Sequence, residues 1–401
     1  MSGRRGLNNW ARGSALAVCC AGVAGAAMAA LRFARRASGP APVGQGLGRG
    51  VALRGTVWPG GDATPFDGVV VIAPDGTIAE LAPAGALRLP ADLPVLGGPR
   101  CWIGPGAVDA HVHLAFGSRS DELRGGLVGV RDLGAPPSDA RRWRTTGRPP
   151  AGSPSVAVAG PVITAPGGYP SRSWGADGFA AFADSPEWAK VVVRGLAADG
   201  IDLVKIALEP GAGWPVPSPA AVRALVEAAH GAGLRVTAHA LTGEMVARAL
   251  EAGVDELCHT PTERLSDDLI ERIAVAGVPV VSTLQTFFSA GQGADAARNA
   301  AALHRSGVRL LYGTDLGNTG TRVGVDPREL DRLADTGLGR LGALRAATEG
   351  SAGAYGVRGR TGRLTVGEPA ALVLLSADPL VDPIAWCAPL AVVADGRLVR
   401  V

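Results

Sequence analysis

Lysine is almost absent from this 401-residue chain. Lysine and arginine together number 39, but only Lys190 and Lys205 are lysines. Lys205 lies in the strand-like stretch GIDLVKIALEP, where composition alone would predict arginine. Arginine keeps its charge in a folded protein, whereas a buried lysine can lose its proton and become a nucleophile or a modified ligand. The residue at position 205 therefore indicates a requirement for an amine.

Aromatic residues, net charge and paired cysteines are also scarce. Aromatic residues make up 4% of the chain, the formal net charge is +3, and the five cysteines show no spacing typical of a zinc site or a disulfide framework. These features argue against nucleic-acid binding and against a disulfide-stabilised scaffold. A hydrophobic content of 47% with 19% charged residues predicts a globular protein with room for one large domain and a smaller one.

The first 43 residues differ from the rest. Arginines flank an Ala/Gly-rich apolar run, residues 14–31, on both sides. The segment fits a signal peptide or a weak membrane anchor. It also fits a disordered tail or an extension from a misplaced start codon, because alanine and glycine add little hydrophobicity and the flanking charges suit no orientation. We keep both interpretations, with a cytoplasmic location preferred and export or anchoring through residues 1–43 as the alternative.

Both ends of the remaining chain are rich in short strands. Residues 51–95 and the last 40 or so residues contain β-rich runs broken by Gly, Pro and Asp-Gly turns. We therefore expect residues 44–101 and 357–401 to form one composite β-sandwich domain. The segment between them, residues 102–356, is then the main domain.

That main segment alternates strand-sized apolar runs with amphipathic helical segments. The expected strands are residues 107–111, 129–133, 155–159, 203–207, 235–239, 256–259, 279–283 and 309–313. The expected helices include residues 219–231, 243–253 and 266–277, each ending in a glycine that suits a C-cap. This order predicts an α/β fold, a distorted (β/α)8 TIM barrel. An open doubly wound sheet is the alternative, but no Gly-rich phosphate loop follows the first strand.

Side chains that can bind metal ions gather at the carboxyl ends of these strands, where barrels place their active sites. They are His111 and His113 after strand one, Lys205 in strand four, His239 in strand five, His259 in strand six and Asp315 after strand eight. Two histidines spaced two residues apart point to the same side of an extended chain and can hold one metal ion. Cys258, by the same alternation, should point away from the barrel interior, so we do not expect it to be a ligand.

With this ordered series, the chain resembles the metal-dependent amidohydrolase superfamily, most closely the imidazolonepropionase-like branch with its prolidase-like dipeptidases. The resemblance covers about residues 51–401. It implies that Lys205 is carboxylated by CO2 and bridges two divalent metal ions. It further implies that His111, His113 and Asp315 hold the first ion, and that His239 and His259 hold the second. Zinc suits these ligands, and manganese, cobalt or iron would also fit.

The resemblance implies a binuclear hydrolase that cleaves an amide bond in a dipeptide, an N-acyl amino acid or a related small amide. A metal-bridging hydroxide would attack the carbonyl, with Asp315 as the base and then the acid. A mononuclear cyclic-amide hydrolase or deaminase and a lactonase of the same superfamily are alternatives. A catalytically silent binding protein is an alternative from another class.

The sequence departs from the family pattern in the expected substrate loops. Tyr169 stands where many relatives have a histidine, so the substrate preference should differ. Arg172, beside it, and Arg322, after the eighth strand, are candidates for binding a substrate carboxylate. The expected partner is a small-molecule substrate and not a nucleic acid. A homo-oligomer is possible, and membrane association is expected only if residues 1–43 are an anchor.

Overall fold

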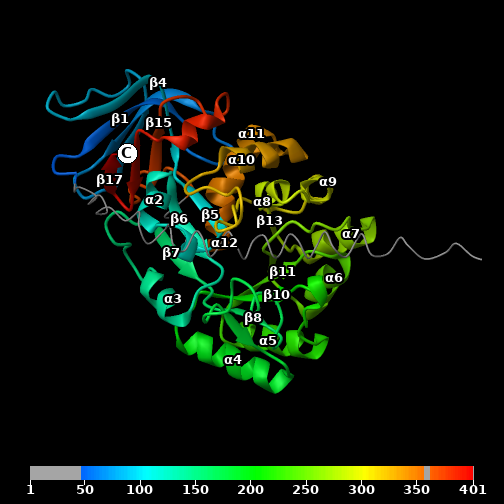
Figure 1. Ribbon diagram of the computed structural model, residues 1–401. Helices are drawn as coiled ribbons and strands as arrows, with labels where there is room; N and C mark the ends of the chain where they lie inside the picture. The colour runs from blue at the N-terminus through cyan, green and yellow to red at the C-terminus, as the bar shows by residue number, and fades with distance from the viewer. Residues whose placement is uncertain (1–46, 356–361, 401) are drawn as a thin grey trace, which may run out of the picture.

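The computed structural model describes residues 47–355 and 362–400 (Figure 1). The extension predicted at residues 1–43 and the predicted boundary near residue 357 lie outside the described residues. Within the described part, no helix combines the length and the apolar composition needed to cross a bilayer.

Strands from both ends of the chain form one seven-stranded sheet in the order β17-β16-β15-β4-β1-β2-β3. The strands are β1 (Val51–Val57), β2 (Phe66–Ile72), β3 (Ile78–Pro83), β4 (Val95–Pro105), β15 (Leu372–Leu375), β16 (Ala391–Ala394) and β17 (Arg397–Arg400). β4 joins the two halves, because it pairs in parallel with β1 and antiparallel with β15. Leu53, Ile72 and Leu372 belong to a separate small core under this sheet. The two flanks therefore meet in a single continuous sheet, and the composite β-sandwich domain stays a prediction.

The middle of the chain forms two parallel sheets. One contains β5 (Ala107–Val112), β6 (Leu127–Asp132) and β7 (Ser155–Val158); the other has the order β14-β13-β12-β11-β10-β8-β9. Its strands are β8 (Val162–Thr164), β9 (Ala180–Phe182), β10 (Leu203–Leu208), β11 (Arg235–Ala240), β12 (Glu256–Leu257), β13 (Val280–Val281) and β14 (Leu310–Leu311). All eight predicted strand segments contain a strand, and β8 and β9 are additional. The α/β class with parallel sheets is confirmed.

The two parallel sheets are not joined into one closed ladder in the described residues, which differs from the predicted barrel. After β7 the chain bends at Gly160, whose φ is 68°, and Pro161 has no N–H for a ladder. Val158 N donates instead to the carboxylate of Asp202 at 3.0 Å. At the opposite edge of the small sheet, β5 contacts the segment that contains β14 through separate backbone hydrogen bonds. Among them are the bonds from Ala110 N to Tyr312 O and from Asp315 N to His111 O.

Helices cover the outside of the parallel sheets, and α4 to α7 follow the curve of the larger sheet (Figure 1). They are α2 (Arg119–Arg124), α3 (Pro137–Trp143), α4 (Pro186–Ala198), α5 (Pro219–Gly231), α6 (Gly243–Ala252), α7 (Asp267–Ala276), α8 (Leu284–Ser289), α9 (Gly293–Arg305), α10 (Pro327–Leu333), α11 (Gly339–Arg345) and α12 (Ser351–Tyr355). Ser218 and Thr242 cap the starts of α5 and α6. Gly253 and Gly277 end α6 and α7 in the left-handed conformation, as predicted.

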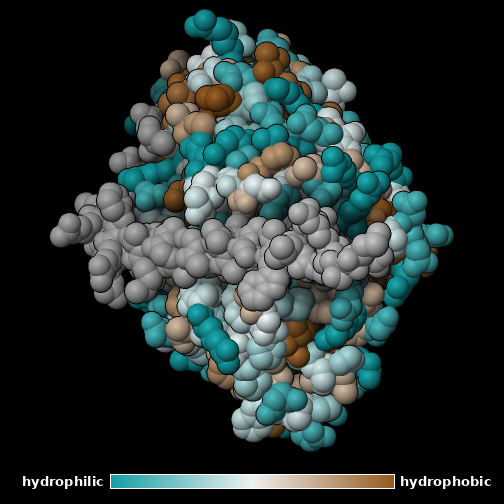
Figure 2. Space-filling view, turned by 45° about the vertical axis from the view of Figure 1, so that its right-hand side comes forward, coloured by the Kyte–Doolittle hydropathy of each residue, from teal (hydrophilic) through white to brown (hydrophobic). Residues whose placement is uncertain are grey.

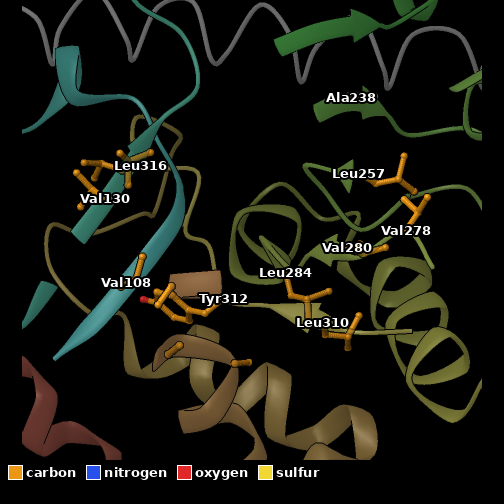
Figure 3. Packing of buried hydrophobic residues seen from close by; sticks show 14 of the residues in the cluster. Val108, Val130, Ala238, Leu257, Val278, Val280, Leu284, Leu310, Tyr312 and Leu316 are labelled. Carbon is orange, nitrogen blue, oxygen red and sulfur yellow. The ribbon is translucent and has the colours of Figure 1, made fainter. Parts of the chain in front are cut away.

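Apolar side chains from the strands pack against the covering helices and fix the strand ends. Figure 3 shows Val108 and Val130 from the small sheet and Leu257, Val280 and Leu310 from the large one, all buried in one core. On the face shown in Figure 2, hydrophilic residues are widespread and hydrophobic ones form small separate patches. The buried core shared by both parallel sheets therefore holds the carboxyl ends of their strands in place.

Candidate metal centre and active-site cavity

The six predicted metal ligands are all buried, with exposed fractions between 0 and 7%. They come from different elements that converge at the carboxyl ends of the strands. His111 is in β5, Lys205 in β10 and His239 in β11. His113, His259 and Asp315 follow β5, β12 and β14 within a few residues.

His111, His113 and Asp315 form the first cluster. Asp315 Oδ1 lies 3.3 Å from His111 Nε2 and 3.4 Å from His113 Nε2. Ligand atoms that share one tetrahedral zinc ion, at about 2.0–2.1 Å each, lie roughly 3.3 Å apart. His111 Nε2, which faces Asp315, is buried without a hydrogen-bond partner among the described residues. Because burying an unpaired polar atom is costly, this donor set fits a bound cation.

His239, His259 and Lys205 lie beside the first cluster. The rings of His239 and His259 are 4.7 Å apart, and those of His111 and His259 are 4.5 Å apart. Lys205 lines the same small cavity as His113, His239, His259 and Asp315. Five of the six side chains therefore line one small polar pocket, and His111 lies against it beside His259 and Asp315.

Hydrogen bonds orient the histidine rings. His111 Nδ1 donates to the backbone oxygen of Cys258 at 2.8 Å, and His239 Nε2 donates to Glu209 Oε2 at 3.0 Å. These bonds leave His111 Nε2 and His239 Nδ1 as the nitrogens that can bind a metal ion. His259 Nδ1 lies 3.0 Å from Thr283 Oγ1. Metal-ligating histidines ordinarily have such an outer partner on the second ring nitrogen.

The electrostatics of the pocket keep two of these rings neutral. Burial, followed by the charges of Lys205 and the neighbouring histidines, lowers the pKa of His111 well below its ordinary value. Burial, followed by the charge of His239, does the same to the pKa of His259. Neutral imidazole is the form that binds metal ions.

Asp315 and Thr283 hold strained backbone conformations. Their φ angles are 54° and 44°, in the left-handed region that non-glycine residues rarely adopt. The buried carboxylate of Asp109 supports the turn before Asp315, because it accepts hydrogen bonds from Thr314 N and Thr314 Oγ1. Burial raises the pKa of Asp109 to about 7. Such strain persists where the surroundings fix a side chain in place, commonly at a functional site.

The comparisons with known proteins agree with this geometry. The model of the amidohydrolase family matches residues 151–399, more than half of the chain. The chain belongs to the amidohydrolase family. This membership supports hydrolase activity and a requirement for metal ions, which amidohydrolases generally have.

Similar proteins include both uncharacterized chains and solved structures. An uncharacterized protein of Mycobacterium tuberculosis is 28% identical over 278 residues, covering 60% of this chain and 72% of that protein. The structure of a Bifidobacterium longum protein assigned as a prolidase has a TM-score of 0.75 at 27% identity, covering 89% of this chain and 95% of that one. A Xaa-Pro dipeptidase has a TM-score of 0.76 at 20% identity, covering 88% and 100%, which supports the fold alone. The predicted resemblance to the prolidase-like amidohydrolases is confirmed.

A larger cavity of about 590 Å³ opens from the polar pocket. His239, His259 and Asp315 line its deep end, and aromatic side chains line its walls: Tyr169, Trp174, Trp214 and Phe287. The Tyr169 ring lies 5.1 Å from both the Trp214 ring and the His239 ring. Trp174 Nε1 donates to Tyr169 Oη at 2.9 Å. In this amidohydrolase, the cavity gives a small molecule access to the predicted metal ligands His239, His259 and Asp315.

The two arginines predicted to bind a substrate carboxylate do not reach this cavity. Arg172 is exposed and lies against Gly167, and neither arginine lines the cavity. The Arg322 guanidinium contacts Cys387 Sγ instead. Position in a loop near the site does not determine side-chain direction, and carboxylate binding by either arginine stays a prediction.

Cys258 also differs from the prediction. Its thiol is fully buried and lies 2.8 Å from Lys205 Nζ, which lines the polar pocket. The expected alternation applies only within an extended strand, and β12 ends at Leu257. Burial raises the pKa of the Cys258 thiol to about 11, so it is a neutral thiol at pH 7.

Sequence reasoning did not select three further residues of the site. Glu209 follows β10 directly, and an acidic residue four positions after Lys205 was a signal for it. Phe287 of α8 and Asn318, whose side chain donates to Asp315 O, carry no such signal. Common residue types in loops become visible as site residues only when the fold brings them together.

Proposed function

We propose that this amidohydrolase cleaves an amide bond of a small substrate at a centre of two divalent metal ions bridged by carboxylated Lys205. The main observation in support of this proposal is the position of Lys205 in the structure. One of only two lysines in the chain is buried among three histidines and an aspartate. A carbamate requires a neutral amine, which lysine can supply and arginine cannot.

The proposed ligand assignment follows the two clusters. His111, His113 and Asp315 would hold one ion, His239 and His259 would hold the other, and carboxylated Lys205 would be a ligand shared between them. Zinc is the first choice for imidazole and carboxylate ligands, and manganese, cobalt or iron would also suit them. When bound, such ions lower the pKa of a water molecule and polarise a substrate carbonyl.

Asp315 is the proposed proton carrier. Its Oδ1 faces His111 and His113, whereas Oδ2 lies 3.9 Å from His259 Nδ1 on the other side. Oδ2 accepts the proton from the attacking water and delivers it to the amide nitrogen that departs. The products are a carboxylic acid and an amine. Tyr169 and the aromatic walls hold the substrate over this carboxylate.

Two structural expectations belong to the same proposal. We infer that the two parallel sheets are halves of a distorted (β/α)8 barrel formed by residues 102–356. Residues 44–101 and 357–401 then form the composite β domain beside it. The similar prolidase and dipeptidase structures favour a dipeptide, an N-acyl amino acid or a related small amide as the substrate.

The test is metal content per chain by elemental analysis after growth with zinc or manganese and bicarbonate. We expect about two ions in the native chain and a loss in Lys205→Ala. Lys190→Ala is a matched control, because Lys190 is exposed on α4 and is the other lysine. Incorporation of ¹³C-labelled bicarbonate, followed by NMR, should give a carbamate signal that is absent in Lys205→Ala and present in Lys190→Ala. One ion or fewer in the native chain, unchanged by loss of Lys205, would refute the binuclear centre.

A further inference from the structure

The charge of the large cavity is one-sided. Away from the proposed metal ligands it is lined by three carboxylates, Glu209, Glu263 and Asp295, and no lysine or arginine is among the described residues that line it. Asp295 is paired with exposed Arg298 at 2.7 Å. Glu209 receives the hydrogen bond from His239 described above. Glu263 accepts a bond from Gly243 N and has no cationic partner among the described residues. A free carboxylate on a substrate would therefore meet like charges here and no cation.

The walls of the cavity are aromatic on several sides. Tyr169, Trp174 and Trp214 gather on one side, with the Tyr169 and Trp174 ring centroids 6.3 Å apart, and Phe287 lies beside His259. Aromatic faces attract apolar rings and organic cations, and they offer nothing to an anion. Aromatic faces combined with carboxylates form the chemistry that binds alkylammonium groups.

We propose that the cavity selects amides by the chemical group beyond the scissile bond. This group carries apolar surface and is either uncharged or positively charged, and a free carboxylate at this place is disfavoured. The proposal rests on the proposed function, because it takes the deep end of the cavity as the place where the amide is cleaved. It narrows the substrate class from dipeptides and N-acyl amino acids to small aromatic or alkylammonium amides. Arg172 and Arg322 would have reversed this preference, but neither lines the cavity.

The first experiment measures binding without hydrolysis. The metal-loaded full chain is titrated with benzyltrimethylammonium, phenylacetamide and benzylsulfonate, which share a benzyl ring and differ in charge. Sulfonate is chosen because it coordinates metal ions weakly. Affinity is read by calorimetry and by the fluorescence of Trp174 and Trp214, which line the cavity. We expect the ammonium ligand to bind about tenfold tighter than the sulfonate, with the neutral amide between them.

Two variants tie this preference to the cavity. Glu263→Gln should weaken the ammonium ligand about threefold and leave the neutral amide unchanged. Glu227→Gln, an exposed acid on α5 outside the cavity, is the matched control and should change neither. Trp214→Leu should weaken the ammonium and amide ligands together. Equal or tighter binding of the sulfonate, or an unchanged ammonium affinity in both Glu263→Gln and Trp214→Leu, would overturn the proposal.

A second experiment separates this inference from the proposed function. Three anilides with one acyl group carry para-carboxymethyl, para-carbamoylmethyl or para-trimethylammoniomethyl groups, whose methylene insulates the reacting bond. Faster kcat/KM for the neutral and cationic anilides would support both proposals. Tight ammonium binding with no hydrolysis of any amide would refute the hydrolase and leave the cavity preference intact. Faster hydrolysis of the carboxylate anilide would support the hydrolase and overturn the proposed cavity preference.

Discussion

The thiol of Cys258 lies against Lys205 and is therefore a second candidate for the bridging metal ligand. Cys258 Sγ is 2.8 Å from Lys205 Nζ and close enough to His111 and His259 to share a metal ion with them. A thiolate would bind zinc well, but the proposed bridge is the carboxylated amine. The two possibilities predict opposite results when the sulfur is removed.

Cys258→Ala should keep the native metal content, because the proposed bridge does not use sulfur. The loss of a buried sulfur should lower the free energy of unfolding by about 1 kcal/mol. Elemental analysis gives the metal content, and the cobalt-substituted native chain should lack a thiolate-to-metal absorption band. Metal loss as large as in Lys205→Ala, together with such a band, would make Cys258 a ligand. Cys101→Ala is the control, at a half-buried cysteine in β4 of the seven-stranded sheet formed from both ends of the chain, which we call the outer sheet.

The sequence allowed the ligand candidates to be named because histidine, lysine and aspartate at strand ends have a chemical signature. Their hydrogen-bond partners have none. Thr283 beside His259 and Glu209 beside His239 are ordinary residues of ordinary loops. Cys258 was misjudged because the end of β12 fell two residues earlier than the apolar pattern indicated. Orientation at the end of a strand depends on tertiary contacts that a local pattern does not contain.

At the scale of elements, one buried ion pair connects the two parallel sheets. Arg131 of β6 contacts Glu256 of β12 through both terminal nitrogens, one of them at 3.1 Å. Arg131 Nε also donates to Ala110 O at 2.7 Å, and Thr237 Oγ1 donates to Glu256 Oε1 at 2.7 Å. The pair therefore joins β5, β6, β11 and β12 in the interior, where no ladder joins the sheets.

Arg131→Met should lower the free energy of unfolding by about 3–5 kcal/mol, because it leaves Glu256 buried without its partner. Arg141→Met removes an exposed ion pair with Asp199 and should cost no more than about 1 kcal/mol. Urea unfolding of both variants measures the difference. The double variant Arg131→Met with Glu256→Leu should recover part of the loss. Equal effects of Arg131→Met and Arg141→Met would show that the pair does not hold the sheets together.

The strands and helices could be predicted from the sequence, but the contacts between the two parallel sheets could not. Helix α5 and the glycine caps of α6 and α7 follow from local periodicity and local turn chemistry, and all eight strand segments were found. The additional strands β8 and β9 are three residues long, which is too short for a pattern to register. Where β7 approaches the larger sheet, the contact is made by Asp202, 44 residues from Val158, through its carboxylate and its backbone N–H, and no local pattern predicts such a contact.

At the scale of the whole molecule, the outer sheet and the predicted metal centre share one continuous piece of chain. β4, central in the outer sheet, ends at Pro105, and β5 begins at Ala107. Only Gly106 separates them, and a side chain there would collide with Val128. Its N–H donates to Ala371 O at 3.1 Å, beside β15. The strand that carries His111 is thus held in place by residues from the far end of the chain.

The stability of the whole molecule should depend on pH through buried carboxyl groups that are not among the predicted metal ligands. Burial raises the pKa of Glu122 from 4.5 to about 8, and burial likewise raises the pKa of Glu329 to about 7. Glu122 Oε2 accepts a bond from Gly324 N at 2.8 Å, while Oε1 is buried without a partner among the described residues. A group with a raised pKa in the folded state contributes its full stability below its unfolded pKa and loses it as the pH rises through the folded value.

Glu122→Gln should therefore flatten the fall in the free energy of unfolding between pH 5 and pH 9. In the native chain this single group accounts for a loss of no more than about 5 kcal/mol across that window, because each pKa unit is worth about 1.4 kcal/mol. The amide cannot ionise, so the variant should gain on the native chain as the pH rises. Urea unfolding at pH 5, 7 and 9, in the presence of a chelator, measures the difference in the free energy of unfolding between the two proteins. Exposed Glu187→Gln should give a curve parallel to the native one. A gap between Glu122→Gln and the native chain that stays constant with pH would mean that Glu122 keeps its ordinary pKa in the folded molecule.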